Sequence, residues 1–192
     1  MSTTTTVPAA PDSPAAPRLS VEEFLTRYAD VPNAELVKGV VKEQPVTTPR
    51  HGMICMTIGA LIFNHAVTNE LGRVMSNDSR VRVGPDSLRG GDVLYFSYER
   101  LPKGAVPEGI LSIAPDLVVE VRSPSDRWLD VFTKVVEYLA AGVRVVVILD
   151  PTTATASVHR ADELQRIFDN GDELTLPDVL PGFSIPVARL FA

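Results

Sequence analysis

The sequence predicts a single α/β (α+β) domain, with a mixed central sheet flanked by helices and extra C-terminal β-hairpins. Three patterns predict it. A strand–helix–strand unit fills residues 115–151, a long helix is expected over residues 50–71, and residues 155–185 hold short strand-like pieces separated by turn residues. With 45% hydrophobic residues among 192, the chain has enough apolar material for one compact core.

The N-terminal segment differs in composition from the rest. Residues 1–17 consist mainly of Thr, Pro, Ala and Ser, which cannot bury enough surface to offset the entropy of ordering. The segment also lacks the basic start and the apolar stretch of a signal peptide. We therefore expect residues 1–18 to form a disordered tail and residues 19–192 to form the domain.

The first helix is expected over residues 20–29. Ser20 is a candidate N-cap, and Glu23 follows at the spacing of a capping box, in which each residue's side chain bonds to the other's backbone N–H. An apolar stripe completes the pattern, with members Phe24, Leu25 and Tyr28. This pattern predicts a short amphipathic helix.

The next two elements are a strand and a long helix. Residues 35–41 predict a strand in which Gly39 forms a turn or bulge, so that a hairpin continues through residues 43–46. Residues 50–71 predict the helix, and Gly72 lies where a C-terminal stop is expected. Its apolar face recurs at steps of three and four residues, through Ile54, Ile58, Leu61, Ile62 and His65.

The middle of the chain predicts strands and a loop. Apolar and polar residues alternate over residues 73–83 well enough to predict one strand. Residues 92–98, after Gly90 and Gly91, are rich in residues that favour strands. Residues 99–113 are rich in Pro and Gly, which predicts a loop.

The clearest pattern is a βαβ unit. Residues 116–121 and residues 143–149 are nearly continuous apolar strands, and residues 126–141 between them predict a helix that ends at Gly142. A strand–helix–strand unit of this length places its strands parallel and adjacent, with the first strand buried on both faces.

Composition restricts the function without fixing it. A net charge of −6 counts against a generic polyanion binder, although a bound divalent metal reverses the sign of an acidic site. No run of 18 uncharged apolar residues occurs, so no membrane span is expected. The single cysteine, Cys55, permits no intramolecular disulfide, which fits a reducing cytoplasm. We expect Cys55 to be a buried apolar filler and not a nucleophile.

Glu120 is the residue that most needs a partner. It interrupts an apolar strand, and an unpaired carboxylate there would cost several kcal/mol. A structural ion pair, a network of donors or a metal ion would each satisfy it. Asp116 lies on the same face but about 13 Å away along the strand, too far to share one ion. Asp116 is therefore expected to be a turn or strand-start residue.

Asp92 is the stronger second acid. It opens a separate strand that can pair antiparallel with the strand of Glu120, about 4.8 Å away, although a loop acid after Gly-Gly is the alternative. Two such carboxylates repel each other and favour a cation. The positive group of the site would be Arg122 or Lys134. The alternative for Lys134 is an exposed pair with Asp130.

The segment from Pro115 to Pro151 resembles the Uma-two family, whose members are classed as restriction endonucleases of the PD-(D/E)xK nuclease superfamily. The resemblance extends to residues 34–39, 50–52 and 92–102, and it covers roughly residues 20–187. It implies a restriction-endonuclease-like core and a divalent-metal site that cleaves nucleic-acid phosphodiester bonds.

The resemblance also implies roles for individual residues. The first motif acid falls on Asp92, although glycine replaces the usual proline before it, and the second falls on Glu120. The motif lysine would have moved from the strand to the following helix, at Lys134. Arg122 occupies the strand position, where it could hold a phosphate but could not act as a base.

Two further residues match positions typical of the family. Glu35 is either a further acid near the metal or a charge at a strand end. His51, near a helix start, is expected to be a capping or surface residue and not a ligand.

These assignments predict a hydrolytic mechanism. Mg²⁺ (or Mn²⁺) would be held by Asp92, Glu120 and the backbone carbonyl of Val121, and Lys134 would orient the attacking water or stabilise negative charge. The substrate would be DNA, and a homodimer would supply two sites for cutting a duplex. The alternative is an inactive module of the same fold that binds nucleic acid or protein. A nucleotide hydrolase has no support, because the sequence has no phosphate-binding loop motif.

Overall fold

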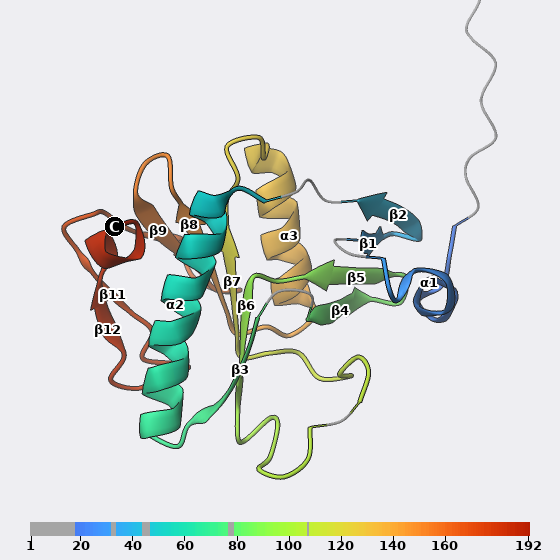
Figure 1. The fold of residues 1–192 in the computed structure, drawn as a ribbon, viewed down its shortest axis with the longest axis horizontal. Coiled ribbons are helices and arrows are strands. Elements are labelled where there is room, and N and C mark those ends of the chain that lie inside the picture. Colours follow the sequence, from blue (N-terminus) through green and yellow to red (C-terminus); the bar gives the residue numbers. More distant parts are fainter. Residues whose placement is uncertain (1–17, 32–33, 44–46, 77–78, 107) are drawn as a thin grey trace, which may run out of the picture.

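The computed structural model describes residues 18–31, 34–43, 47–76, 79–106 and 108–192. The predicted tail therefore lies, up to residue 17, outside the described residues. A six-stranded mixed sheet lies between two helices, α2 (Pro49–Thr68) and α3 (Trp128–Ala140), as Figure 1 shows. In chain order its strands are β3 (Gly72–Ser76), β6 (Val93–Ser97), β7 (Leu117–Val121), β8 (Val145–Asp150), β9 (Thr155–His159) and β10 (Arg166–Phe168). Their order across the sheet is β10-β9-β8-β7-β6-β3, which confirms the predicted mixed central sheet.

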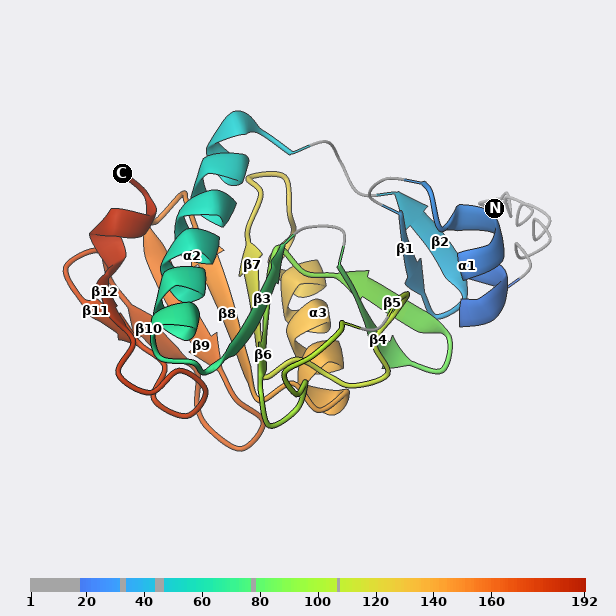
Figure 2. The ribbon, with the colours of Figure 1, turned by 60° about the horizontal axis from the view of Figure 1, so that its bottom comes forward.

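A smaller unit lies to one side of this sheet (Figure 2). It contains helix α1 (Val21–Tyr28) and a four-stranded sheet in the order β2-β1-β5-β4. The strands are β1 (Ala34–Val37), β2 (Val40–Glu43), β4 (Arg80–Gly84) and β5 (Ser87–Gly90). The capping box predicted for α1 is present, because the side chains of Ser20 and Glu23 each accept a hydrogen bond from the other's backbone N–H.

The predicted strand over residues 35–41 is a tight hairpin. Lys38 and Gly39 have φ values of 50° and 77°, as a two-residue turn with the twist of the flanking strands requires. Gly39 thus makes the predicted turn, and β1 and β2 pair antiparallel on either side of it. The hairpin was expected to continue through residues 43–46, of which residues 44–46 lie outside the described residues.

The long helix is confirmed, but its predicted stop is wrong. α2 ends at Thr68, and Gly72 is the first residue of β3. A Cβ at Gly72 would lie 2.1 Å from the carbonyl oxygen of Phe96 on β6. Position 72 therefore needs glycine because two backbones approach closely there, and not because a helix ends.

The single strand predicted over residues 73–83 is also wrong. The segment instead contains two strands: β3, which pairs with β6, and β4, which pairs with β5 in the smaller sheet. β5 was not predicted, because four residues that include an arginine and a glycine give only a weak β pattern. The predicted loop over residues 99–113 is confirmed, since its described residues form no helix or strand.

The βαβ unit is confirmed. β7 and β8 are parallel neighbours, and Gly142 follows α3 with a φ of 96°. The helix begins at Trp128 and not at residue 126, because the Asp126 side chain instead accepts a hydrogen bond from the Ser123 N–H in a turn. The C-terminal hairpins are confirmed as β9–β10 and as β11 (Glu173–Thr175) with β12 (Ser184–Pro186), followed by a short 3₁₀ helix, η1 (Val187–Leu190).

Each face of the central sheet carries its own core. Val119 and Val147 pack on the side of α2, whereas Val118 and Val146 pack on the side of α3. α2 is long and apolar enough, by length and composition, to cross a membrane. Its buried side chains, such as Ile58, pack against the central sheet, which accounts for the apolar character of the side of the helix that faces the sheet.

We predict that Gly72→Ala destabilises the protein by about 3 kcal/mol, because the new methyl group forces β3 away from β6. Gly52→Ala is the matched control. A Cβ at Gly52 meets nothing within 4 Å, and alanine in a helix stabilises by up to about 1 kcal/mol. Urea unfolding of both variants measures the effects. Equal stability of the two variants would contradict the role assigned to Gly72.

Candidate metal centre and its ion-pair network

Asp92 and Glu120 lie at adjacent strand ends. β6 and β7 are antiparallel, with Val93 opposite Val119, so continuing the register by one residue places Asp92 opposite Glu120. The predicted pairing of these strands is confirmed. A Cβ at Gly91 would lie 2.6 Å from the Leu94 side chain and 3.1 Å from the Val118 side chain, both buried, so a larger residue here would require these side chains to move.

The Asp92 carboxylate is held by backbone and by α2. Its Oδ2 accepts a hydrogen bond of 2.7 Å from the Val121 N–H and lies 3.4 Å from Nε2 of His51. The hydrogen bond to Asp92 raises the pKa of His51, burial opposes this shift, and the Val121 carbonyl adds to it. The backbone of Val121 thus borders this site through both its N–H and its carbonyl.

His51 is not the surface residue that the sequence predicted. It is buried, because the first turn of α2 packs against the end of the central sheet. The N-cap of α2 is Thr48, whose hydroxyl accepts a hydrogen bond from the His51 N–H. Cys55, one turn later, is buried as predicted, and its Sγ lies 3.4 Å from Nδ1 of His51. Burial and the charge of Asp92 raise the pKa of the Cys55 thiol.

Glu120 receives two partners from α3. Nζ of Lys134 lies 3.2 Å from one carboxylate oxygen, and the hydroxyl of Tyr138 donates a 2.7 Å hydrogen bond to the other. Burial raises the pKa of Glu120 to about 7, Lys134 opposes the shift, and the negative charge of Asp92 adds to it. Negative charge at this position is therefore incompletely compensated by the side chains around it.

Lys134 is directed into this site and is not an exposed partner of Asp130. Its side chain is 22% exposed, and its Nζ also lies 3.4 Å from Glu35. Burial disfavours its charge, but Glu120 and Glu35 outweigh burial and raise the pKa of Lys134. Lys134 and Tyr138 lie one helical turn apart, so both reach Glu120. Tyr138 was not among the predicted site residues, and its spacing of four residues from Lys134 was the signal available in the sequence.

Glu35 belongs to the interior and is not a strand-end charge. It lies in β1, is 4% exposed, and pairs with Arg89 at 2.9 Å while accepting a hydrogen bond from the Gly90 N–H. Burial raises the pKa of Glu35, but Lys134 and Arg89 outweigh this effect and lower it. Arg89 also pairs with Glu137 at 2.7 Å. Arg89 was missed because its strand, β5, was missed.

Arg122 has a different set of partners. It forms an ion pair of 3.2 Å with Asp150 and lies over the ring of Trp128, 4.7 Å from its centroid. Asp116 lies at the other end of β7, where it accepts a hydrogen bond from Ser97 and pairs with Arg100. This confirms that Asp116 starts a strand and lies apart from Glu120.

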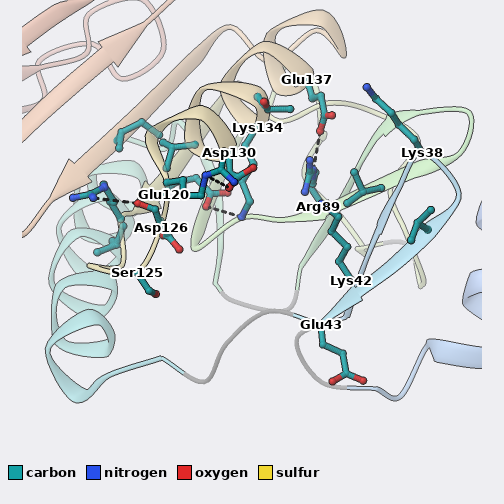
Figure 3. Close-up of a pocket in the computed structure, with 18 of the residues that line it drawn as sticks. Lys38, Lys42, Glu43, Arg89, Glu120, Ser125, Asp126, Asp130, Lys134 and Glu137 are labelled. Carbon is teal, nitrogen blue, oxygen red and sulfur yellow. Dashed lines mark hydrogen bonds and ion pairs between the residues drawn. The ribbon is translucent and has the colours of Figure 1, made fainter. Parts of the chain in front are cut away.

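A cavity of about 650 Å³ opens beside Glu120 and Lys134, between α3 and the β1–β2 hairpin (Figure 3). Although the chain is acidic overall, basic side chains outnumber acidic ones in the lining. The basic members are Arg18, Lys38, Lys42, Arg89, Arg122, Arg127 and Lys134. The acidic members are Glu43, Glu120, Asp126, Asp130 and Glu137.

A mixed sheet thus lies between two helices, and two acids and a lysine gather at one end of its central strands. A model of the Uma2 (Uma-two) family, described as "Putative restriction endonuclease", matches residues 21–188, so the chain belongs to that family. A crystal structure of "a putative nuclease belonging to DUF820 from Anabaena variabilis ATCC 29413" has the same fold. It superposes with a TM-score of 0.81 at 22% identity, covering 90% of this chain and 97% of the other. No curated protein matches.

We predict that Glu120→Gln stabilises the metal-free protein by about 3 kcal/mol more at pH 8.5 than at pH 5. One pKa unit corresponds to about 1.4 kcal/mol. The folded-state pKa of Glu120, about 7, exceeds its ordinary value of 4.5. As pH rises from 4.5 to 7, the unfolded chain releases this proton before the folded chain does, so stability falls over this window.

Urea unfolding in a chelating buffer at the two pH values measures this difference. Titrating groups that do not interact with Glu120 affect both proteins alike and cancel in the comparison. If the wild type keeps or gains stability relative to Glu120→Gln between pH 5 and pH 8.5, the side chains around Glu120 fully compensate its charge and the account of this site is wrong.

Proposed function

We propose that this protein is a metal-dependent endonuclease that hydrolyses phosphodiester bonds of nucleic acid, with DNA as its substrate. The observation that supports this most directly is the convergence of Asp92, Glu120 and Lys134. Two acids from antiparallel strands lie side by side, and a half-buried lysine from the covering helix reaches one of them. Membership of the Uma2 family supports the same class of activity.

The donor set suits a hard divalent ion. The carboxylates of Asp92 and Glu120 and the carbonyl of Val121 are the residues that would hold Mg²⁺ (or Mn²⁺), and all three donors are oxygens. When bound, the ion would act as a Lewis acid on the phosphate and lower the pKa of a water molecule. The raised pKa of Glu120 is consistent with a site that gains from added positive charge.

Lys134 supplies a fixed positive charge beside the proposed metal site. Its Nζ is held by two acids on different strands, Glu120 and Glu35, which orient it before substrate arrives. We infer that Lys134 orients the attacking water or stabilises negative charge on the phosphate. Arg122 takes no such role in this proposal, because its guanidinium is paired with Asp150.

The cavity lining fits a phosphate backbone. Lys38 and Lys42 on the β1–β2 hairpin and Arg127 at the start of α3 are exposed, and all three line the cavity. Such side chains bind phosphates without reading sequence. A homodimer would place two such sites on a duplex.

We predict that Lys134→Ala lowers the rate of Mg²⁺-dependent plasmid cleavage by about 100-fold or more, the usual cost of removing a charge-stabilising donor. Asp92→Asn should abolish cleavage. Lys103→Ala is the matched control and should cleave at the wild-type rate, because Lys103 is an exposed lysine paired with Glu70. If wild-type protein neither cleaves any nucleic acid nor binds Mg²⁺ or Mn²⁺ by calorimetry, the chain is instead a binding module.

We also predict that Lys42→Ala weakens DNA binding and lowers the slope of log affinity against log salt by about 0.9, the value for one lost phosphate contact. Binding is measured in the Asp92→Asn background, so that no substrate is cut. Lys103→Ala in the same background should leave the slope unchanged. An unchanged slope for Lys42→Ala would place the nucleic acid outside the cavity.

A further inference from the structure

The inner face of α2 carries two metal-binding side chains that the proposed nuclease reaction does not use. His51 and Cys55 are four residues apart on the helix, so both point toward the end of the central sheet, and both are buried. Asp92 lies against them. One ligand atom from each of the three residues can be chosen so that all three atoms lie within 4.8 Å of one another.

The distances suit a small tetrahedral ion. Cys55 Sγ lies 3.4 Å from His51 Nδ1, and His51 Nε2 lies 3.4 Å from Asp92 Oδ2. The ligands of a tetrahedral ion lie about 2.0 to 2.3 Å from the ion, and this geometry places them at separations from one another that are similar to the two 3.4 Å distances. The imidazole contacts its two neighbours through different nitrogens, but one of these nitrogens lies within 4.8 Å of a ligand atom of both neighbours.

The donors select a different class of ion from the nuclease site. A soft thiolate and a borderline imidazole, together with one carboxylate, favour Zn²⁺ or Co²⁺, whereas an all-oxygen set favours Mg²⁺. Three protein ligands leave the fourth tetrahedral position to water. Asp92 belongs to both sets and cannot serve both fully.

We propose that His51, Cys55 and Asp92 form a binding site for a thiophilic divalent ion, with Zn²⁺ as the natural occupant, and that Zn²⁺ bound there withdraws Asp92 from the Mg²⁺ site. The Cys55 thiol gives its proton to solvent as the sulfur–metal bond forms, and nothing is oxidised or reduced. Zn²⁺ is therefore an inhibitor of the nuclease. The inhibition rests on the proposed function, but the binding site does not.

Titration of the reduced, metal-free full-length protein with Co²⁺ tests the site directly. We expect one equivalent to produce a thiolate-to-cobalt band in the near ultraviolet and the intense visible bands of tetrahedral Co²⁺, both removed by Zn²⁺. Cys55→Ser should lose the ultraviolet band and bind Co²⁺ at least about tenfold more weakly, since even altered outer contacts of a metal site cost 10- to 100-fold. The matched control is Met56→Ala, an exposed neighbour on α2 that should keep both signals.

His51→Gln removes a different ligand and replaces Cys55→Ser in the test if circular dichroism shows that Cys55→Ser does not fold. The proposal is overturned if wild-type protein binds Co²⁺ without a thiolate band, or if both ligand variants bind as tightly as wild type. Cleavage assays give a separate readout. Cys55→Ser should cleave with Mg²⁺ at the wild-type rate but require at least about tenfold more Zn²⁺ for inhibition. A protein that binds Co²⁺ as expected but never cleaves would contradict the nuclease and leave the site intact.

Discussion

The ion pair between Lys134 and Glu120 joins α3 to the strand at the centre of the sheet, and much of the surrounding structure follows from it. Glu120 interrupts the interior side of β7, where a carboxylate loses hydration. Lys134 compensates part of that charge, but it also lies 3.4 Å from Glu35 in the smaller sheet. The same lysine thus connects the central sheet, the helix that covers it and the smaller sheet.

The other polar side chains of the interior extend this arrangement. Tyr138 donates its hydroxyl to the second oxygen of Glu120, and Arg89 neutralises Glu35 while reaching Glu137 on α3. A buried charge pair is a weak source of stability by itself, since the desolvation penalty offsets much of the attraction. The pair between Glu120 and Lys134 is therefore expected to add little net stability to the fold.

The sequence was most informative where local pattern and tertiary environment agree. The βαβ unit was visible from two apolar runs around an amphipathic helix, and Glu120 stood out as a charge within one of those runs. Asp92 followed from the geometry of neighbouring strands. The assignment of Lys134 to the site rested on family resemblance, because helical spacing alone favoured an exposed pair with Asp130.

What the sequence did not show depends on contacts between distant segments. Gly72 has the appearance of a helix stop, and only the carbonyl of Phe96 explains why glycine is needed there. Arg89 lies in a four-residue strand whose partners, Glu35 and Glu137, are remote in the chain. His51 resembles a helix-start residue until α2 is packed against the end of the sheet, which buries it beside Asp92.

The central claim is that Asp92 and Glu120 bind one ion together, and a crystal structure grown with Mn²⁺ tests it most directly. The account predicts an anomalous-scattering peak about 2.1 Å from a carboxylate oxygen of each residue, the distance expected for an octahedral hard cation. A fully soaked crystal with no peak there, or with a peak that only one of the two acids reaches, would contradict the account.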